Sequence, residues 1–225
     1  MAEQPKGTCA YCDAVISRSG ATRHLSACRE RRAAVEKANA EARRRETLLH
    51  LRVQDKYDKA FWLDLEMQGD AEIGELDHYL RAIWLECCGH MSQFVAGGWG
   101  SHEFEMDERA DRVFQPGATL THMYDFGTTS HTLVKVVGTR SGAPTSRHPI
   151  ALLARNVLPE TPCIKCEQPA TRLCTECVIE KGVWGALCDE HARKHPHRNY
   201  GRPTPLINSP RMGMCGYDGP AKPPY

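Results

Sequence analysis

The sequence predicts an α+β fold, with a central mixed sheet, one main amphipathic helix and small modules at both ends. Short apolar runs bounded by turn residues recur through residues 47–158 and predict strands. One stretch of the same region repeats apolar residues at helical spacing. Eight of the eleven cysteines fall in two clusters near the ends of the chain. At 225 residues, the chain is long enough for one core with small appended modules.

The central region, residues 47–158, opens with two predicted strands at 48–53 and 59–67, joined by a polar turn. An amphipathic helix is predicted next, with acidic residues in its first turn and Gly89 just beyond its end. Its apolar stripe comprises Ile73, Leu76, Leu80, Ile83, Trp84 and Cys87. The remaining strands are expected at 93–96, 102–106, 119–124, 132–137 and 150–154.

The first cysteine cluster lies within residues 1–46. Cys9 and Cys12 have the spacing of a metal-binding turn, and His24 and Cys28 lie four residues apart, on one face of a predicted helix. Four such ligands can complete a tetrahedral zinc site, and so short a segment needs metal to fold. We therefore predict a single zinc finger with a long basic helix that runs on to about residue 46. The alternative is a chance grouping of thiols.

This N-terminal module carries ten basic and six acidic residues, whereas residues 47–158 carry ten basic and fifteen acidic ones. Nucleic acid should therefore be attracted to the end of the chain and not to its middle. In DNA-reading fingers the start of the helix enters the major groove and basic side chains contact phosphates. The candidate contacts with DNA or RNA are Arg18, Ser19, Thr22, Arg23, Arg29, Arg31, Arg32, Arg43, Arg44 and Arg45. The alternative is a solvated helix whose arginines pair with the interspersed glutamates.

The second cluster, within residues 159–200, offers eight ligands in four pairs. Only seven residues separate Cys166 from Cys174, too few for a simple zinc ribbon, so a cross-braced arrangement of two zinc ions is expected. One site would comprise Cys163, Cys166, Cys188 and His191, and the other Cys174, Cys177, His195 and His197. With the N-terminal finger, the prediction is about three Zn²⁺ per chain.

The order of these ligands, above all in the segment Leu187–His197, resembles a B-box zinc finger. That resemblance implies contacts with a protein partner rather than reading of bases. The single residue between His195 and His197 departs from the pattern, so one of the two can lie outside the metal's coordination sphere. A version with one zinc ion also stays open.

Three stretches of the central region, Leu76–Phe94, Tyr124–Thr129 and Leu133–Val137, resemble the plasmid pRiA4b open-reading-frame-three family of bacteria and their mobile elements. The family is also labelled an insertion-element passenger resolvase, TnpR. The resemblance spans the central region and implies a compact α+β domain. It supplies no catalytic residues, and the sequence lacks the catalytic pattern of a serine recombinase.

Two motifs in these stretches invite a functional interpretation. The segment Cys87-Cys-Gly-His90 can be a metal site or a nucleophile with its base, or else Cys87 is an apolar helix residue and Gly89 a helix cap. The triplet Asp125-Phe-Gly127 matches the magnesium-binding triplet of protein kinases, but the chain lacks a Gly-rich phosphate loop. We expect this triplet to form a turn between strands, with Gly127 supplying the unusual backbone angles.

These features together predict a non-enzymatic zinc protein, an adaptor or nucleic-acid-associated factor, with nucleic acid at the N-terminal module and a protein partner at the C-terminal one. One alternative is a metal-dependent hydrolase or nuclease, and its candidate residues are Cys88, His90, His102, Asp125 and His131. Another is a structural-zinc protein with a small-molecule-binding or oligomerising central domain.

The sequence also bears on where the protein is located. No signal peptide or membrane span is evident, so we expect no membrane association and a cytoplasmic location. In a reducing compartment paired cysteines hold metal more often than they form disulfides.

Residues 201–225 are expected to form a Gly- and Pro-rich tail without regular elements, either flexible or docked on the central domain through Met212, Met214, Cys215 and Tyr217.

Overall fold

The computed structural model describes residues 5–225 and divides into two compact units. The first unit extends to Leu80, resumes over Met91–Val157 and includes Tyr225. The second comprises Arg81–His90 and Leu158–Pro224. The predicted α+β class is confirmed. Residues 81–90, which the sequence placed in the central region, belong to the second unit with the C-terminal cysteines.

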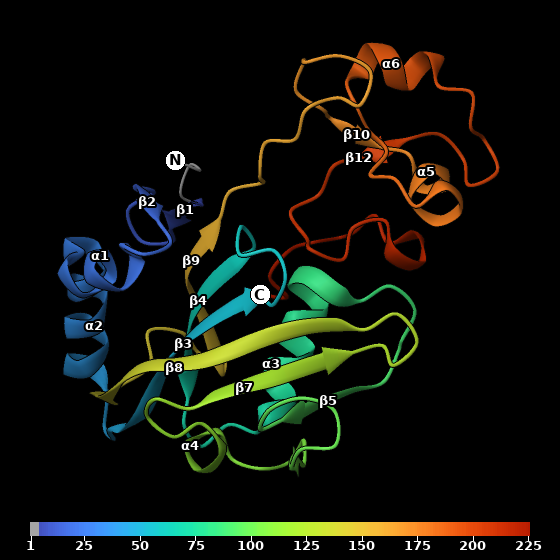
Figure 1. Ribbon diagram of the computed structural model, residues 1–225. Helices are drawn as coiled ribbons and strands as arrows, with labels where there is room; N and C mark the ends of the chain where they lie inside the picture. The colour runs from blue at the N-terminus through green and yellow to red at the C-terminus, as the bar shows by residue number, and fades with distance from the viewer. Residues whose placement is uncertain (1–4) are drawn as a thin grey trace. The chain divides into compact units, whose positions relative to one another are not determined.

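The first unit is built on a nine-stranded sheet, counted over residues 5–225 (Figure 1). The strand order is β2-β1-β9-β4-β3-β8-β7-β5-β6. The strands are β1 Lys6–Cys9, β2 Val15–Ser17, β3 Glu46–Asp55, β4 Trp62–Gln68, β5 Ser92–Val95, β6 Glu103–Phe104, β7 Thr119–Tyr124, β8 Ser130–Gly142 and β9 Ile150–Asn156. Neighbouring strands are antiparallel throughout these pairs, where the sequence led us to expect a mixed sheet.

The strands predicted in the central region all occur. β4 lies between β3 and β9 and is buried along nearly its whole length. Leu63, Leu65 and Met67 alternate along it with Asp64 and Glu66, and all five are buried. One face of β4 is therefore apolar and the other carries two buried carboxylates.

Four helices occur in the described part of the first unit. They are α1 Ala21–Ala27, α2 Arg29–Glu41, α3 Ile73–Leu80 and α4 Ala110–Val113. The buried residues Ile73, Leu76 and Tyr79 place the apolar face of α3 in the core. The predicted amphipathic helix is thus α-helical only as far as Leu80.

The prediction of one long basic helix that reaches residue 46 is wrong about where the helix breaks and ends. Cys28 has extended backbone angles, φ −60° and ψ 119°, so α1 stops before it and α2 starts after it. α2 ends at Glu41, and residues 43–45 form the connection to β3. The helix is interrupted at the position of the fourth predicted zinc ligand.

The N-terminal segment shares the core of the central sheet. β1 pairs with β9, and Leu25 packs in one cluster with Trp62 and Leu153. A Cβ at Gly7 would lie 2.4 Å from the carbonyl oxygen of Arg155, so only glycine lets β1 approach β9 this closely. Burial against the sheet therefore contributes to folding of this segment, which the sequence treated as a separate metal-dependent module.

The second unit is small and irregular. Its elements are the π-helical turn η1 Arg81–Leu85, then β10 Arg172–Leu173, α5 Thr175–Lys181, β11 Ala186–Leu187, α6 Asp189–Lys194, β12 Thr204–Pro205 and the 3₁₀ turn η2 Met214–Gly216. The strands form a sheet in the order β11-β10-β12.

The C-terminal tail contains two of these elements, contrary to the expectation of none. β12 pairs with β10, and η2 follows a segment in which Ser209, Arg211 and Met212 are buried. Tyr217 is buried as well. The tail is therefore a folded part of the second unit.

No helix in residues 5–225 combines the length and the apolar character needed to cross a membrane.

Candidate metal centres

Cysteine and histidine side chains in residues 5–225 gather in four groups of four, which together use all eleven cysteines of the chain. In each group the potential ligand atoms lie within 4.8 Å of one another. The first quartet is Cys9, Cys12, His24 and Cys28; the second is Cys163, Cys166, Cys188 and His191; the third is Cys174, Cys177, His195 and His197; the fourth is Cys87, Cys88, His90 and Cys215. The donor sets are those that hold structural zinc.

Tetrahedral zinc sets a scale for the distances within a quartet. Zinc bonds of about 2.3 Å to sulfur and about 2.0 Å to nitrogen place two sulfur ligands about 3.8 Å apart. A sulfur and a nitrogen ligand then lie about 3.5 Å apart, and two nitrogens about 3.3 Å apart.

The first quartet joins the end of β1 to α1. Cys9 Sγ lies 4.0 Å from Cys28 Sγ, and Cys12 Sγ lies 3.4 Å from His24 Nε2. The turn that carries the first two thiols is closed by a 3.0 Å hydrogen bond from the Cys9 N–H to the carbonyl of Ala14. These separations match the edges of a zinc tetrahedron.

The second quartet gathers three sulfur atoms around one imidazole. His191 Nδ1 lies 3.5 Å from Cys163 Sγ, 3.5 Å from Cys166 Sγ and 3.3 Å from Cys188 Sγ. Desolvation raises the pKa of the Cys163 thiol, but backbone N–H donors outweigh it and lower the pKa to about 6. The Lys165 N–H is one of these donors, 3.4 Å from the sulfur. This environment favours the thiolate, which is the form that binds metal.

The third quartet contains both histidines of the unusual His-Pro-His segment. Cys177 Sγ lies 3.3 Å from His195 Nε2 and 3.3 Å from His197 Nδ1, and the two ring nitrogens are 3.1 Å apart. Burial, chiefly, lowers the pKa of His195 and so favours the neutral imidazole that ligates metal. A carboxylate oxygen of Glu176 lies 4.0 Å from His197 Nε2 and can orient that ring. Both histidines are thus placed to serve as ligands.

Chain order shows how the second and third quartets interleave. Cys163 and Cys166 form a group with Cys188 and His191, although Cys174 and Cys177 of the third quartet lie between these two pairs in the sequence. The structure therefore brings together the two sets of residues that the spacing paired in a cross-brace. Gly185 makes the close packing possible, because a Cβ there would lie 2.5 Å from Cys177 Cβ.

The fourth quartet was only partly visible in the sequence. Cys88 Sγ lies 3.1 Å from His90 Nε2 and 3.5 Å from Cys87 Sγ. Cys215 joins them from the tail. Cys87 lies beyond the last π-helical residue, Leu85, so its interpretation as an apolar helix residue is wrong. The segment Cys87-Cys-Gly-His90 was already a candidate metal site in the sequence, whereas the fourth ligand, Cys215, was marked only by lying outside the terminal clusters.

Three of the predicted nucleic-acid contacts form hydrogen bonds with side chains of β3 or β4. Arg31 donates to Glu66 Oε2 at 3.1 Å, and Arg18 donates to Gln54 Oε1 at 2.9 Å. The Thr22 hydroxyl accepts a 3.3 Å hydrogen bond from Arg52. Arg31, whose side chain is 14% exposed, is therefore a structural residue and not a free phosphate ligand.

The other predicted contacts are exposed: Ser19, Arg23, Arg29, Arg32, Arg43, Arg44 and Arg45. Arg44 makes a 3.0 Å ion pair with Asp70, and that arginine side chain is 77% exposed. Between the described residues, the glutamates of α2 make no ion pair with its arginines. The expected pairing of charges along the helix is thus not seen, and most of its arginines are open to solvent.

The residues proposed for a hydrolytic site do not form a metal-binding group in the described part of the chain, apart from Cys88 and His90. Asp125 instead shapes the turn between β7 and β8: its Oδ1 accepts the N–H groups of Gly127 at 2.9 Å and Thr128 at 3.2 Å. The positive φ of this turn, 66°, belongs to Asp125 and not to Gly127 as the sequence suggested. His131 packs edge-on against Tyr57.

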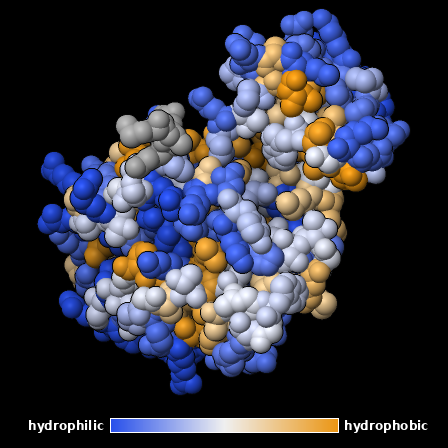
Figure 2. All heavy atoms as spheres, viewed as in Figure 1, coloured by the Kyte–Doolittle hydropathy of each residue, from blue (hydrophilic) through white to orange (hydrophobic). Residues whose placement is uncertain are grey.

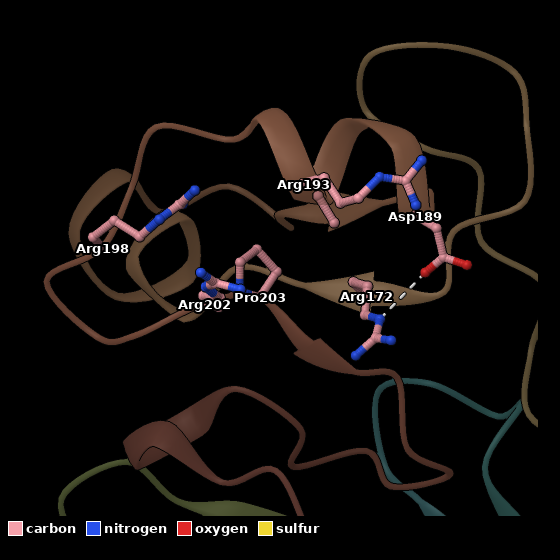
Figure 3. A pocket seen from close by; sticks show the side chains of 7 residues that line it. Arg172, Asp189, Arg193, Arg198, Arg202 and Pro203 are labelled. Atoms are coloured by element: carbon pink, nitrogen blue, oxygen red, sulfur yellow. Dashed lines mark hydrogen bonds and ion pairs between the residues drawn. The ribbon is translucent and has the colours of Figure 1, made fainter.

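A pocket lined by arginines lies in the second unit (Figure 3). Its charged residues are Arg172, Arg193, Arg198, Arg202 and Asp189. Arg172 makes a 3.3 Å ion pair with Asp189, and Arg198 donates to the backbone carbonyls of His195 and His197. Four guanidinium groups against one carboxylate give the pocket an excess of positive charge.

No family model and no curated protein matches the chain. Among solved structures, the crystal structure of a protein of unknown function from Methanosarcina mazei Go1 matches with a TM-score of 0.40 and 14% sequence identity. The match covers 46% of this chain and 66% of that chain, so it spans just under two thirds of that protein's length.

Proposed function

We propose that the protein is a zinc-binding, non-enzymatic adaptor that associates with nucleic acid through its N-terminal segment and with a protein through its C-terminal unit. The proposal rests on the arrangement of ligands in the first three quartets. Each brings four potential protein ligands within 4.8 Å of one another. A site with four protein ligands is closed, whereas a catalytic zinc keeps a position open for water or substrate.

The N-terminal surface supports binding of a polyanion. Arg23, Arg29 and Arg32 are exposed on or beside the finger, and Arg43 to Arg45 are exposed just before β3. Hydrophilic residues predominate over the part of the first unit that carries α1 and α2 (Figure 2). Arginine side chains that are free to move can follow a phosphate backbone without reading bases.

The C-terminal unit supports binding of a protein. Ile179, Val183 and Trp184 lie within six residues of one another and are 45%, 48% and 46% exposed. Exposed apolar residues of this size, tryptophan above all, are enriched at protein interfaces. The arginine pocket of the same unit would favour a partner that carries carboxylates.

The central region adds a biological context to the proposal. Its resemblance to the plasmid pRiA4b open-reading-frame-three family suggests a role in bacteria or their mobile elements. Such a role is consistent with an adaptor that contacts nucleic acid.

A gel-shift assay at low salt tests the nucleic-acid part of the proposal, because phosphate contacts are strongest there. Labelled duplex and single-stranded DNA and RNA are each titrated with the zinc-loaded full chain. We expect retardation of at least one nucleic acid, and weaker retardation with the combined Arg29→Ala, Arg32→Ala variant. Absence of binding to every probe would contradict the proposal.

A further inference from the structure

The fourth quartet is formed by segments far apart in the sequence. Cys87, Cys88 and His90 follow the π-helical turn η1, and Cys215 lies in η2, more than 120 residues later. A π-helical turn widens the backbone locally and is often found at functional sites. All four residues belong to the second unit.

The tail that carries Cys215 is held against residues 81–90 by further contacts. The Ser209 hydroxyl donates to the carbonyl of Trp84 at 2.5 Å, and both residues are buried. Cys215 has a φ of 50°, a left-handed conformation that is uncommon for a residue with a side chain. Such conformations persist where the surroundings impose them, often at ligand sites.

A fully buried arginine lies against the quartet. Arg211 is 0% exposed, and its guanidinium donates to Cys87 Sγ at 3.4 Å and to Cys215 Sγ at 3.5 Å. Burial of a cation is costly unless an opposite charge lies nearby. Three thiolates around one Zn²⁺ carry a net charge of about −1. Hydrogen bonds from a guanidinium to the ligating sulfurs would stabilise that charge and be stabilised by it.

We propose that Cys87, Cys88, His90 and Cys215 bind a fourth zinc ion, with Arg211 as its charge partner. This ion fastens the C-terminal segment to residues 81–90. Cys88 and Cys215 are exposed, whereas each of the other three quartets contains at least one buried cysteine. The fourth ion is therefore the one that a chelator reaches first.

The test compares the zinc content of the full chain with that of two variants, Cys88→Ser and Cys215→Ser. Both thiols are exposed, so serine in their place disturbs no packing. Met214→Ser is the matched control, because Met214 is exposed beside Cys215 but offers no ligand to the quartet. The proteins are purified in reductant, loaded with zinc and analysed by elemental mass spectrometry.

We expect Cys88→Ser and Cys215→Ser each to hold one zinc ion fewer than the wild type, and Met214→Ser to hold the same number. In the wild type, a chromogenic chelator should withdraw one ion per chain in a fast phase, and this phase should be missing in both cysteine variants. Equal zinc content in all four proteins would overturn the proposal. So would an intact mass showing that Cys88 or Cys215 forms a disulfide in the zinc-loaded chain.

Discussion

Arg31 Nη2 lies 3.1 Å from Glu66 Oε2 and joins the N-terminal helix α2 to strand β4. Arg140 donates to the same carboxylate from β8, at 2.8 Å. The Glu66 side chain is 4% exposed, so its charge depends on these two guanidinium groups. The N-terminal segment is thus tied to the sheet by an ion pair as well as by the pairing of β1 with β9.

Neighbouring arginines of α2 should therefore differ in what they do. We expect Arg31→Ala to lower the free energy of unfolding by about 1 to 3 kcal/mol, since it removes one of the charged hydrogen bonds of a buried carboxylate. Arg32 is exposed, and Arg32→Ala should change stability by less than about 0.5 kcal/mol. Urea denaturation of the zinc-loaded variants measures both. Equal losses would show that the contact with Glu66 contributes nothing.

The third quartet should be sensitive to the residue at position 185. Gly185→Ala introduces a Cβ 2.5 Å from Cys177 Cβ and 2.9 Å from the carbonyl oxygen of Cys174, so the cysteine pair must move. We expect this variant to lose one zinc ion per chain. Gly98→Ala is the control, because nothing lies within 4 Å of a Cβ at that position. Full zinc content in Gly185→Ala would show that the third quartet does not need the observed packing.

The strands of the central sheet were predictable because alternation of apolar and polar residues is a local signal. The buried carboxylates of β4 were not: Asp64 and Glu66 follow the alternation as polar residues, yet both are buried. Their partners Arg52, Arg140 and Arg31 come from three other elements. Only the tertiary fold shows that these charges meet inside the protein, and only there does Arg31 cease to be a candidate for phosphate binding.

Asp125 gives a separate test of the turn that resembles a kinase motif. Asp125→Ala removes the acceptor of two backbone N–H groups and leaves a side chain poorly suited to positive φ, so a loss of roughly 1 to 3 kcal/mol in stability is expected. Asp125→Asn keeps an acceptor and tolerates positive φ, and should be milder. Thermal unfolding and zinc analysis would be run together. A loss of zinc from Asp125→Asn would indicate that Asp125 contributes to metal binding.

Some metal ligands could likewise be recognised from local sequence spacing, and one could not. The first three quartets are built from pairs of ligands within one turn or helix, so their spacing is visible in the sequence. Cys215 has no ligand near it along the chain and reaches its quartet only because the tail folds back within the second unit. A lone cysteine carries no spacing signal.

The exposed arginines before β3 should act through charge alone. For duplex DNA, the slope of log affinity against log salt falls in magnitude by about 0.9 for each phosphate contact removed. We expect the triple variant of Arg43, Arg44 and Arg45 to alanine to show this reduction. A triple variant of Lys56, Lys59 and Lys135 to alanine removes the same charge from other exposed positions and should keep the wild-type slope. Identical slopes in both variants would place nucleic acid elsewhere.

The most direct measurement is native mass spectrometry of the full chain, which counts metal ions on the folded protein. We predict four zinc ions per chain, with the ion of the fourth quartet the first to leave when chelator is added. Three ions, undiminished by Cys215→Ser, would remove the fourth site. Two or fewer ions on a chain with native circular dichroism would contradict the central claim that the cysteine and histidine quartets are zinc sites.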